Sequence, residues 1–307
     1  MRQTSVMGGG GGREGQTFAG RSLAVRYANL VKLPHTVFAL PFALVGVTLA
    51  SYVARVTLSE VVWVVVAFTA ARFAAMGFNR IADRDVDSLN PRTLSREIPS
   101  GSLSVNAAAA AVVVASLLFI IAAWQLNPLC LALSPVALGW VLFYSYTKRF
   151  TRWCHLVLGI GLSIAPVGGY LAVTGAWSDP WWMLIALAVA VASWVGGFDI
   201  LYALQDIDFD CAQGLHSLPA SLGERGALNV ARLLHICTVL ALVGVGVAVG
   251  AHWIYAAGVI VATTLLLYEH SLVKPGDLGR LDAAFFTMNG VISIVFFAFV
   301  LTERLRS

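Results

Sequence analysis

VVWVVVAFTAARFAAMGFNRIADRDVDSLNPRT, residues 61–93, joins a long apolar run to a polar segment that carries three carboxylates. About 20 consecutive apolar residues are enough for a helix to cross the hydrocarbon core of a bilayer. Carboxylates at the edge of a membrane are costly unless they bind a partner. The stretch therefore predicts a membrane helix with a ligand site where the chain leaves the bilayer.

The whole chain shares this apolar character. Of its 307 residues, 59% are hydrophobic and 12% are charged, which is unlike the composition of a soluble globular protein. The apolar runs are continuous and rich in Ala, Leu and Val, so helices are favoured over the alternating strands of a barrel. We predict an all-α polytopic membrane protein with nine transmembrane helices. The predicted spans are 35–54, 61–78, 105–125, 128–146, 154–175, 181–200, 228–249, 252–270 and 282–302.

The first 30 residues differ from the rest, because they contain a glycine run and no apolar core. We predict a flexible N-terminal tail over 1–30, followed by a single membrane domain over 31–307. Residues 21–33 mix basic and apolar side chains, which suits either a short helix on the lipid headgroups or an extension of the first span. Met7 is a possible second start.

Lys and Arg concentrate before the first span and in the loops after the second, fourth and eighth spans. Short loops rich in these residues stay in the cytoplasm, so we assign this side of the protein to the cytoplasm of a bacterial inner membrane. The net charge of +4 reflects this asymmetry and favours anionic headgroups and substrates. It gives no reason to expect nucleic acid. His155, near a span end, is expected to pack at the membrane interface.

Two polar segments repeat one spacing. Asn79, Asp83 and Asp87 are four residues apart, and so are Tyr202, Asp206 and Asp210. Residues four apart lie on one face of a helix. We therefore predict two acidic helix ends on the same side of the membrane, one in each of two related halves, about 31–150 and 151–307.

Two acidic faces without partners would repel each other, and a hard cation resolves the conflict. Mg²⁺ is commonly held by one or two carboxylates together with substrate phosphates. A third cytoplasmic loop adds Tyr144, Lys148 and Arg149, whose hydroxyl and cationic groups suit a diphosphate. The sequence therefore predicts Mg²⁺ and a diphosphate ligand between the two halves.

These motifs resemble those of a known family. NRIADRDVD, YALQDIDFD and YSYTKR are similar to the two Asp-rich motifs and the basic loop of the UbiA family of intramembrane aromatic prenyltransferases, and the likeness covers about residues 35–293. The resemblance implies nine helices around a central cavity that holds Mg²⁺ and an isoprenoid diphosphate. Finer motifs, including NPRTLSREIPSG and GLHSLPASLG, are similar to the 4-hydroxybenzoate polyprenyltransferase-like subgroup. Arg80 and Glu97 depart from many relatives and leave 1,4-dihydroxy-6-naphthoate as an alternative acceptor.

The resemblance also implies roles for single residues. The metal ligands would be Asn79, Asp83, Asp87, Asp206 and Asp210. The diphosphate would be held by Arg92, Arg96, Lys148 and Arg149. Tyr144 and Tyr202 would line the pocket near the reacting carbon, and Asp199 would help to deprotonate the acceptor. Arg72 would bind the acceptor carboxylate, or alternatively pair with Asp199 or another buried carboxylate.

The resemblance implies transfer of a polyprenyl group to an aromatic acid in ubiquinone or menaquinone biosynthesis, with membrane lipid around the prenyl tail. A secondary transporter is a rival interpretation, but its site is expected near the middle of the membrane rather than at helix ends. A membrane scaffold is a weaker rival, because it gives no reason for two matched cation sites.

Overall fold

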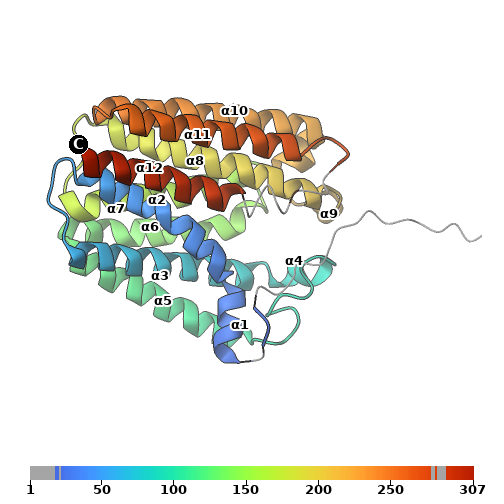
Figure 1. Ribbon diagram of the computed structural model, residues 1–307. Helices are drawn as coiled ribbons and strands as arrows, with labels where there is room; N and C mark the ends of the chain where they lie inside the picture. Colours follow the sequence, from blue (N-terminus) through green and yellow to red (C-terminus); the bar gives the residue numbers. More distant parts are fainter. Residues whose placement is uncertain (1–17, 21, 278–280, 282–287) are drawn as a thin grey trace, which may run out of the picture.

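The computed structural model describes residues 18–20, 22–277, 281 and 288–307. The described chain is helical and forms no β-strand, and its long helices lie side by side in one bundle (Figure 1). The long helices are α2 (Leu33–Ala50), α3 (Leu58–Ala82), α5 (Val105–Leu126), α6 (Pro128–Thr147), α7 (Cys154–Thr174), α8 (Trp182–Ala203), α10 (Leu218–Ala248), α11 (Trp253–Leu272) and α12 (Asn289–Arg306). The short ones are α1 (Leu23–Leu30), α4 (Arg84–Leu89), η1 (Leu204–Asp206) and α9 (Ile207–Gln213). Each predicted span overlaps one long helix.

The prediction of an all-α membrane protein is confirmed, although the expected number of spans is not. Within the described residues, 7 helices are long and apolar enough to cross a membrane, against nine predicted. A shorter apolar segment, Ala39–Ala50, lies within α2. The ninth predicted span, 282–302, begins at residues outside the described ranges, and α12 ends in charged residues.

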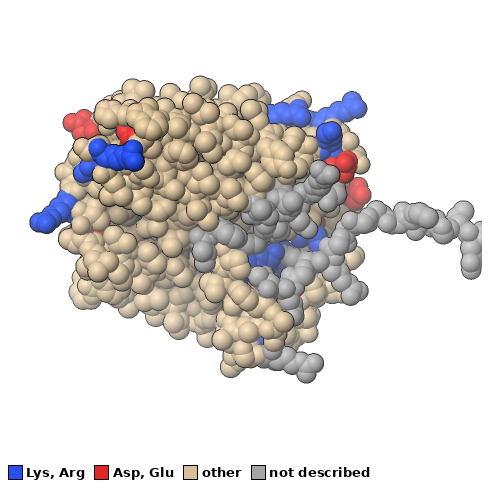
Figure 2. All heavy atoms as spheres, viewed as in Figure 1, with Lys and Arg blue, Asp and Glu red and all other residues tan. Residues whose placement is uncertain are grey.

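The surface has the charge distribution of a membrane protein. Charged side chains gather at two opposite ends of the bundle, and an uncharged flank lies between them (Figure 2). Large apolar side chains such as Leu117, Leu118 and Ile121 of α5 are exposed on the outside of the bundle. Lipid covers such residues in a membrane, so their exposure needs no protein partner.

The centre of the bundle is α8, which packs between α7 and α10. Glycine allows the close approach of α7 to α8, because a Cβ atom on Gly159 would collide with the backbone carbonyl of Ala192. This contact matters for the site, since it holds the first turn of α7 against the last two turns of α8. His155 and Asp199 lie on these two facing segments.

Part of the N-terminal region is helical, in agreement with one of the two interpretations of residues 21–33. Leu23–Leu30 form helix α1, so this part of the expected tail is helical, while residues 1–17 lie outside the described ranges. Lys32 has a left-handed backbone with φ 46°, which separates α1 from α2. The short helix is therefore not a continuous extension of the first span. Arg26 ties it to the loop before α5 by donating to the Ser102 carbonyl at 2.7 Å.

Candidate active site

The two Asp-rich motifs fold in the same way. α3 ends at Ala82, the backbone turns at Asp83 (φ −94°, ψ 4°), and α4 follows. α8 ends in the short helix η1, the backbone turns at Asp206 (φ −104°, ψ 7°), and α9 follows. Each motif is thus a long helix that breaks at a carboxylate and continues as a short helix. The break leaves the helical spacing intact in the first motif, where the Asp83 and Asp87 amides still donate to the carbonyls four residues earlier.

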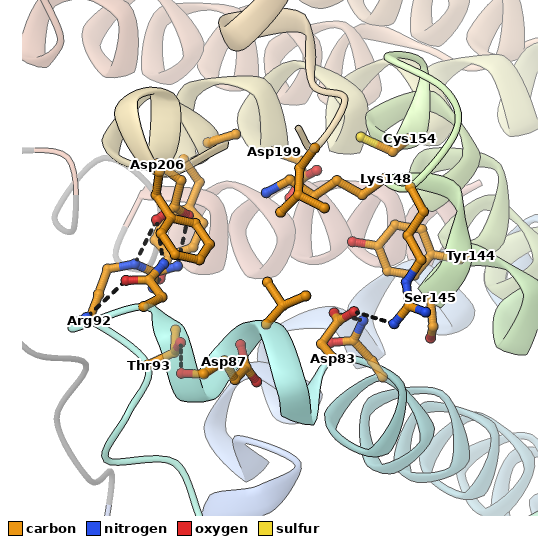
Figure 3. Close-up of a pocket in the computed structure, with 18 of the residues that line it drawn as sticks. Asp83, Asp87, Arg92, Thr93, Tyr144, Ser145, Lys148, Cys154, Asp199 and Asp206 are labelled. Atoms are coloured by element: carbon orange, nitrogen blue, oxygen red, sulfur yellow. Dashed lines mark hydrogen bonds and ion pairs between the residues drawn. The ribbon is translucent and has the colours of Figure 1, made fainter. Parts of the chain in front are cut away.

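A cavity of about 180 Å³ lies between the motifs at this end of the bundle. Figure 3 shows Asp83 and Asp87 on one side of it and Asp199 and Asp206 on the other. The predicted site residues that line it are Asn79, Asp83, Asp87, Arg92, Arg96, Tyr144, Lys148, Arg149, Asp199, Tyr202 and Asp206. Asp210 and Arg72 are not among the lining residues. The structure therefore brings together most of the residues predicted from sequence.

The predicted metal ligands and the predicted diphosphate-binding residues contact each other one to one. Each of the four basic residues has a nitrogen near the oxygen of a different Asp. The pairs are Arg96–Asp87 at 2.6 Å, Lys148–Asp210 at 2.7 Å, Arg92–Asp206 at 2.8 Å and Arg149–Asp83 at 3.8 Å. Without a ligand, the acidic and basic sets thus neutralise each other.

The Arg92 contact joins the two motifs. Its guanidinium binds the Asp206 carboxylate through two nitrogens, at 3.1 and 2.8 Å, and donates to the Tyr202 hydroxyl at 3.2 Å. Asn90 also donates to Asp206, at 3.3 Å. A two-pronged Arg–carboxylate contact fixes direction as well as distance. The loop after α4 is therefore fastened to the end of α8, across the mouth of the cavity.

Two charged groups at the membrane edge have shifted pKa values. Burial and, to a smaller extent, the neighbouring charge of Asp87 raise the pKa of Asp83 to about 6, although nearby cations oppose this shift. Burial alone would lower the pKa of Lys148, but the Asp210 carboxylate outweighs burial and raises it. Lys148 is therefore a stable cation, whereas the Asp83 carboxyl takes up a proton readily unless a cation binds it.

The oxygen donors suit a cation that shares its ligands with a substrate. Among the described residues, no three His, Cys, Asp or Glu side chains converge on a closed metal site. The Asn79 amide donates to the Asp83 carboxylate at 2.9 Å, so its own oxygen remains an available ligand. Carboxylate and amide oxygens that face an open cavity fit Mg²⁺, which keeps positions for water and phosphate oxygens.

His155 lies in the site, although the sequence predicted interfacial packing for it. The side chain is 2% exposed, lines the cavity, and its Nδ1 lies 2.7 Å from an Asp199 oxygen. No spacing signal could have found this contact, because the partners are 44 residues apart and meet only when α7 packs on α8. Further lining residues absent from the prediction are Val86, Asn90, Thr93, Ser145, Cys154, Ala203, Phe209 and Leu215.

Arg72 lies in α3, seven residues before Asn79 and therefore about 10 Å deeper in the membrane. Within the described part of the chain it forms no ion pair, and its buried Nε has no hydrogen-bond partner. Within the described residues the Asp199 carboxylate contacts His155 and forms no ion pair with Arg72. A guanidinium without an anion remains available inside the membrane domain.

The fold and the cavity define an integral membrane protein with a charge-paired site at one end of its helix bundle. The chain belongs to the UbiA prenyltransferase family, which it matches over residues 39–291. It is 33% identical to the 4-hydroxybenzoate octaprenyltransferase of Alcanivorax borkumensis over 203 residues, 66% of this chain and 69% of that protein. The Marinomonas sp. enzyme of the same name is 32% identical, covering 75% of this chain and 80% of its own.

Solved structures agree with the family. The apo structure of a UbiA homolog from Aeropyrum pernix K1 has a TM-score of 0.80 and 33% sequence identity, over 88% of this chain and 98% of that chain. A UbiA homolog from Archaeoglobus fulgidus bound to DMAPP and Mg²⁺ has a TM-score of 0.70 at 21% identity, over 90% and 99% of the two chains, and shares the fold. The chain is a prenyltransferase.

Proposed function

We propose that the protein transfers a polyprenyl group from polyprenyl diphosphate to an aromatic acid of the 4-hydroxybenzoate type in quinone biosynthesis. The observation that carries this proposal is the one-to-one pairing of four cations that line one cavity with four carboxylates, three of which line it as well. A metal–diphosphate ligand matches both sets of residues. The metal would take the place of the basic side chains beside the carboxylates, and the diphosphate would take the place of the carboxylates beside the basic side chains. The names of the relatives support the acceptor class.

Mg²⁺ is the proposed cofactor, and the Archaeoglobus homolog bound to Mg²⁺ and DMAPP supports it. The ligands would be Asn79, Asp83 and Asp87 of the first motif and Asp206 and Asp210 of the second. Bound there, Mg²⁺ would neutralise charge on the leaving diphosphate. Asp210 is fully buried and held by Lys148, so it contributes only after that ion pair opens.

The remaining steps use groups of the protein itself. Arg92, Arg96, Lys148 and Arg149 bind the diphosphate oxygens as the allylic C–O bond breaks, and the diphosphate leaves with the bonding electron pair. The rings of Tyr144 and Tyr202 stabilise the prenyl cation. The acceptor ring forms the new C–C bond with a π-electron pair. Its ring proton passes to the Asp199 carboxylate, the C–H electrons restore aromaticity, and Arg72 orients the acceptor through its carboxylate.

The proposal extends to the membrane arrangement. We infer nine transmembrane helices in one domain over 31–307, with two pseudo-repeated halves, about 31–150 and 151–307. The matching backbone turns at Asp83 and Asp206 support the repeat. The predominance of Lys and Arg in loops at the cavity end supports a cytoplasmic site in a bacterial inner membrane, with membrane lipid around the prenyl tail.

A secondary transporter is a weaker candidate for this site. Transporters with repeated halves bind substrates near the middle of the membrane, on interrupted helices. Here the paired charges lie where α3 and α8 end. Turnover in detergent, where no gradient exists, separates the two functions.

The decisive experiment is a turnover assay on purified protein in nanodiscs, with a polyprenyl diphosphate and either 4-hydroxybenzoate or 1,4-dihydroxy-6-naphthoate. We expect Mg²⁺-dependent product from the hydroxybenzoate and loss of product in EDTA that returns when Mg²⁺ is added. Product from the naphthoate alone would change the acceptor assignment, and the assignment as a prenyltransferase would stand. Product from neither acceptor, with a folded protein, would overturn the proposed acceptor class.

A further inference from the structure

We propose that His155 is a positioning residue that holds the Asp199 carboxylate at the cavity, so that Asp199 accepts the proton released when the acceptor ring is prenylated. The inference rests on the proposed function. It assigns a role to His155, and it explains why one carboxylate of the cavity can act as a base while the others bind the metal and its diphosphate.

Asp199 differs from the other carboxylates of the cavity in its partner. Asp83, Asp87 and Asp206 each lie within ion-pair distance of an arginine. Asp199 has no Lys or Arg partner within the described ranges, and its contact is the imidazole of His155 at 2.7 Å. Asp199 therefore faces a hydrogen-bonding imidazole, whereas its neighbours face a guanidinium.

Three helices fix the imidazole. His155 lies in the first turn of α7, Asp199 in the penultimate turn of α8, and Leu218 is the first residue of α10. The Leu218 amide donates to His155 Nε2 at 3.4 Å, while His155 Nδ1 faces Asp199. The ring is buried, so it cannot turn away without breaking both contacts.

These contacts determine which nitrogen carries the proton. A backbone amide can only donate, so Nε2 accepts and carries no proton. The neutral ring then has its proton on Nδ1 and donates it to Asp199. The contact between His155 Nδ1 and the Asp199 carboxylate therefore fixes the direction of that carboxylate.

Few other side chains are placed to accept the proton that leaves the acceptor ring. The other titratable side chains that line this part of the cavity are Tyr144 on α6, Cys154 beside His155 and Tyr202 on α8. The Tyr202 hydroxyl already accepts from Arg92 at 3.2 Å. Asp199 lines the cavity together with both tyrosines and is the carboxylate there that contacts no arginine within the described residues. After C–C bond formation it becomes a carboxylic acid, and it passes the proton to the departing diphosphate.

The test compares two substitutions at position 155. His155→Asn keeps an amide donor near the position of Nδ1, whereas His155→Leu keeps bulk and removes the donor. We expect the Leu variant to lower kcat by roughly 10–100-fold, the usual loss when a hydrogen-bonded supporting residue is removed. We expect the Asn variant to recover most of that loss. The KM for polyprenyl diphosphate should stay unchanged in both, because the paired charges are untouched.

Controls separate positioning from folding. Thermal unfolding and Mg²⁺-dependent binding of polyprenyl diphosphate are measured on each variant, and His252→Leu, an exposed site at the other end of the bundle, serves as the matched control. Equal damage in the Asn and Leu variants, or full kcat in the Leu variant, would overturn the role of His155. Failure of the proposed function looks different, because the wild-type protein would then form no product with either acceptor.

Discussion

Replacing Asp83 or Asp206 with Asn is expected to lower kcat/KM for a polyprenyl diphosphate by on the order of 10²–10³-fold, the usual loss when one charge-stabilising group is removed from an active site. Both side chains line the cavity and face basic residues that would hold the diphosphate. An amide keeps the shape and loses the charge that binds a divalent cation. Steady-state turnover at several Mg²⁺ concentrations measures the loss, and excess Mg²⁺ should recover part of it.

The same segments offer matched controls. Asp85 lies between the two acids of the first motif, its side chain is 80% exposed, and it lies 3.3 Å from the neighbouring Arg84. Asp208 is the exposed counterpart in the second motif. Asp85→Asn and Asp208→Asn should stay within about twofold of wild type, because exposed ion pairs contribute little. Equal losses at the exposed and the cavity-lining positions would mean that only net charge matters and would contradict the metal site.

A second substitution at Arg92, the partner of Asp206, separates a loss of stability from a loss of catalysis. Asp206→Asn leaves the Arg92 guanidinium, which is mostly buried, without its carboxylate, and this lowers stability. The double variant Arg92→Gln, Asp206→Asn removes both charges and should recover the melting temperature. Turnover should not recover, since the double variant lacks a metal ligand and a diphosphate ligand. If turnover recovers together with the melting temperature, the Arg92–Asp206 pair serves only the fold.

Sequence reasoning found the helical membrane fold and most of the cavity, because both depend on short-range patterns. The apolar runs define the helices, and the four-residue spacing places Asn79, Asp83 and Asp87 on one face even though the helix breaks at Asp83. The basic loop with Lys148 and Arg149 was found because it directly follows a predicted span. These signals lie within a few turns of one helix and need no knowledge of packing.

The contacts between helices could not be predicted in this way. The pairing of Arg92 with Asp206 joins positions 114 residues apart, and the contact of His155 with Asp199 depends on how closely α7 approaches α8. The sequence named both charge sets but not their mutual neutralisation.

Arg72→Met is expected to raise the KM for the aromatic acid by about 100-fold, since a hydrogen bond between charged groups is worth roughly 1.5–3 kcal/mol and a guanidinium can form two with a carboxylate. The KM for polyprenyl diphosphate should not change, because Arg72 does not line the charge-paired cavity. The acceptor itself provides a second test. Wild type should prefer 4-hydroxybenzoate strongly over a phenol without the carboxylate, and the Met variant should lose this preference.

Stability distinguishes acceptor binding from a role in the fold. The Arg72 Nε is buried without a hydrogen-bond partner in the described part of the chain, so the charge costs free energy in the absence of substrate. Arg72→Met should therefore unfold at the same temperature as wild type or higher, while binding the acid more weakly. A lower melting temperature with unchanged acid preference would show that Arg72 supports the helix bundle. A retained preference at unchanged stability would place the acceptor carboxylate at another residue.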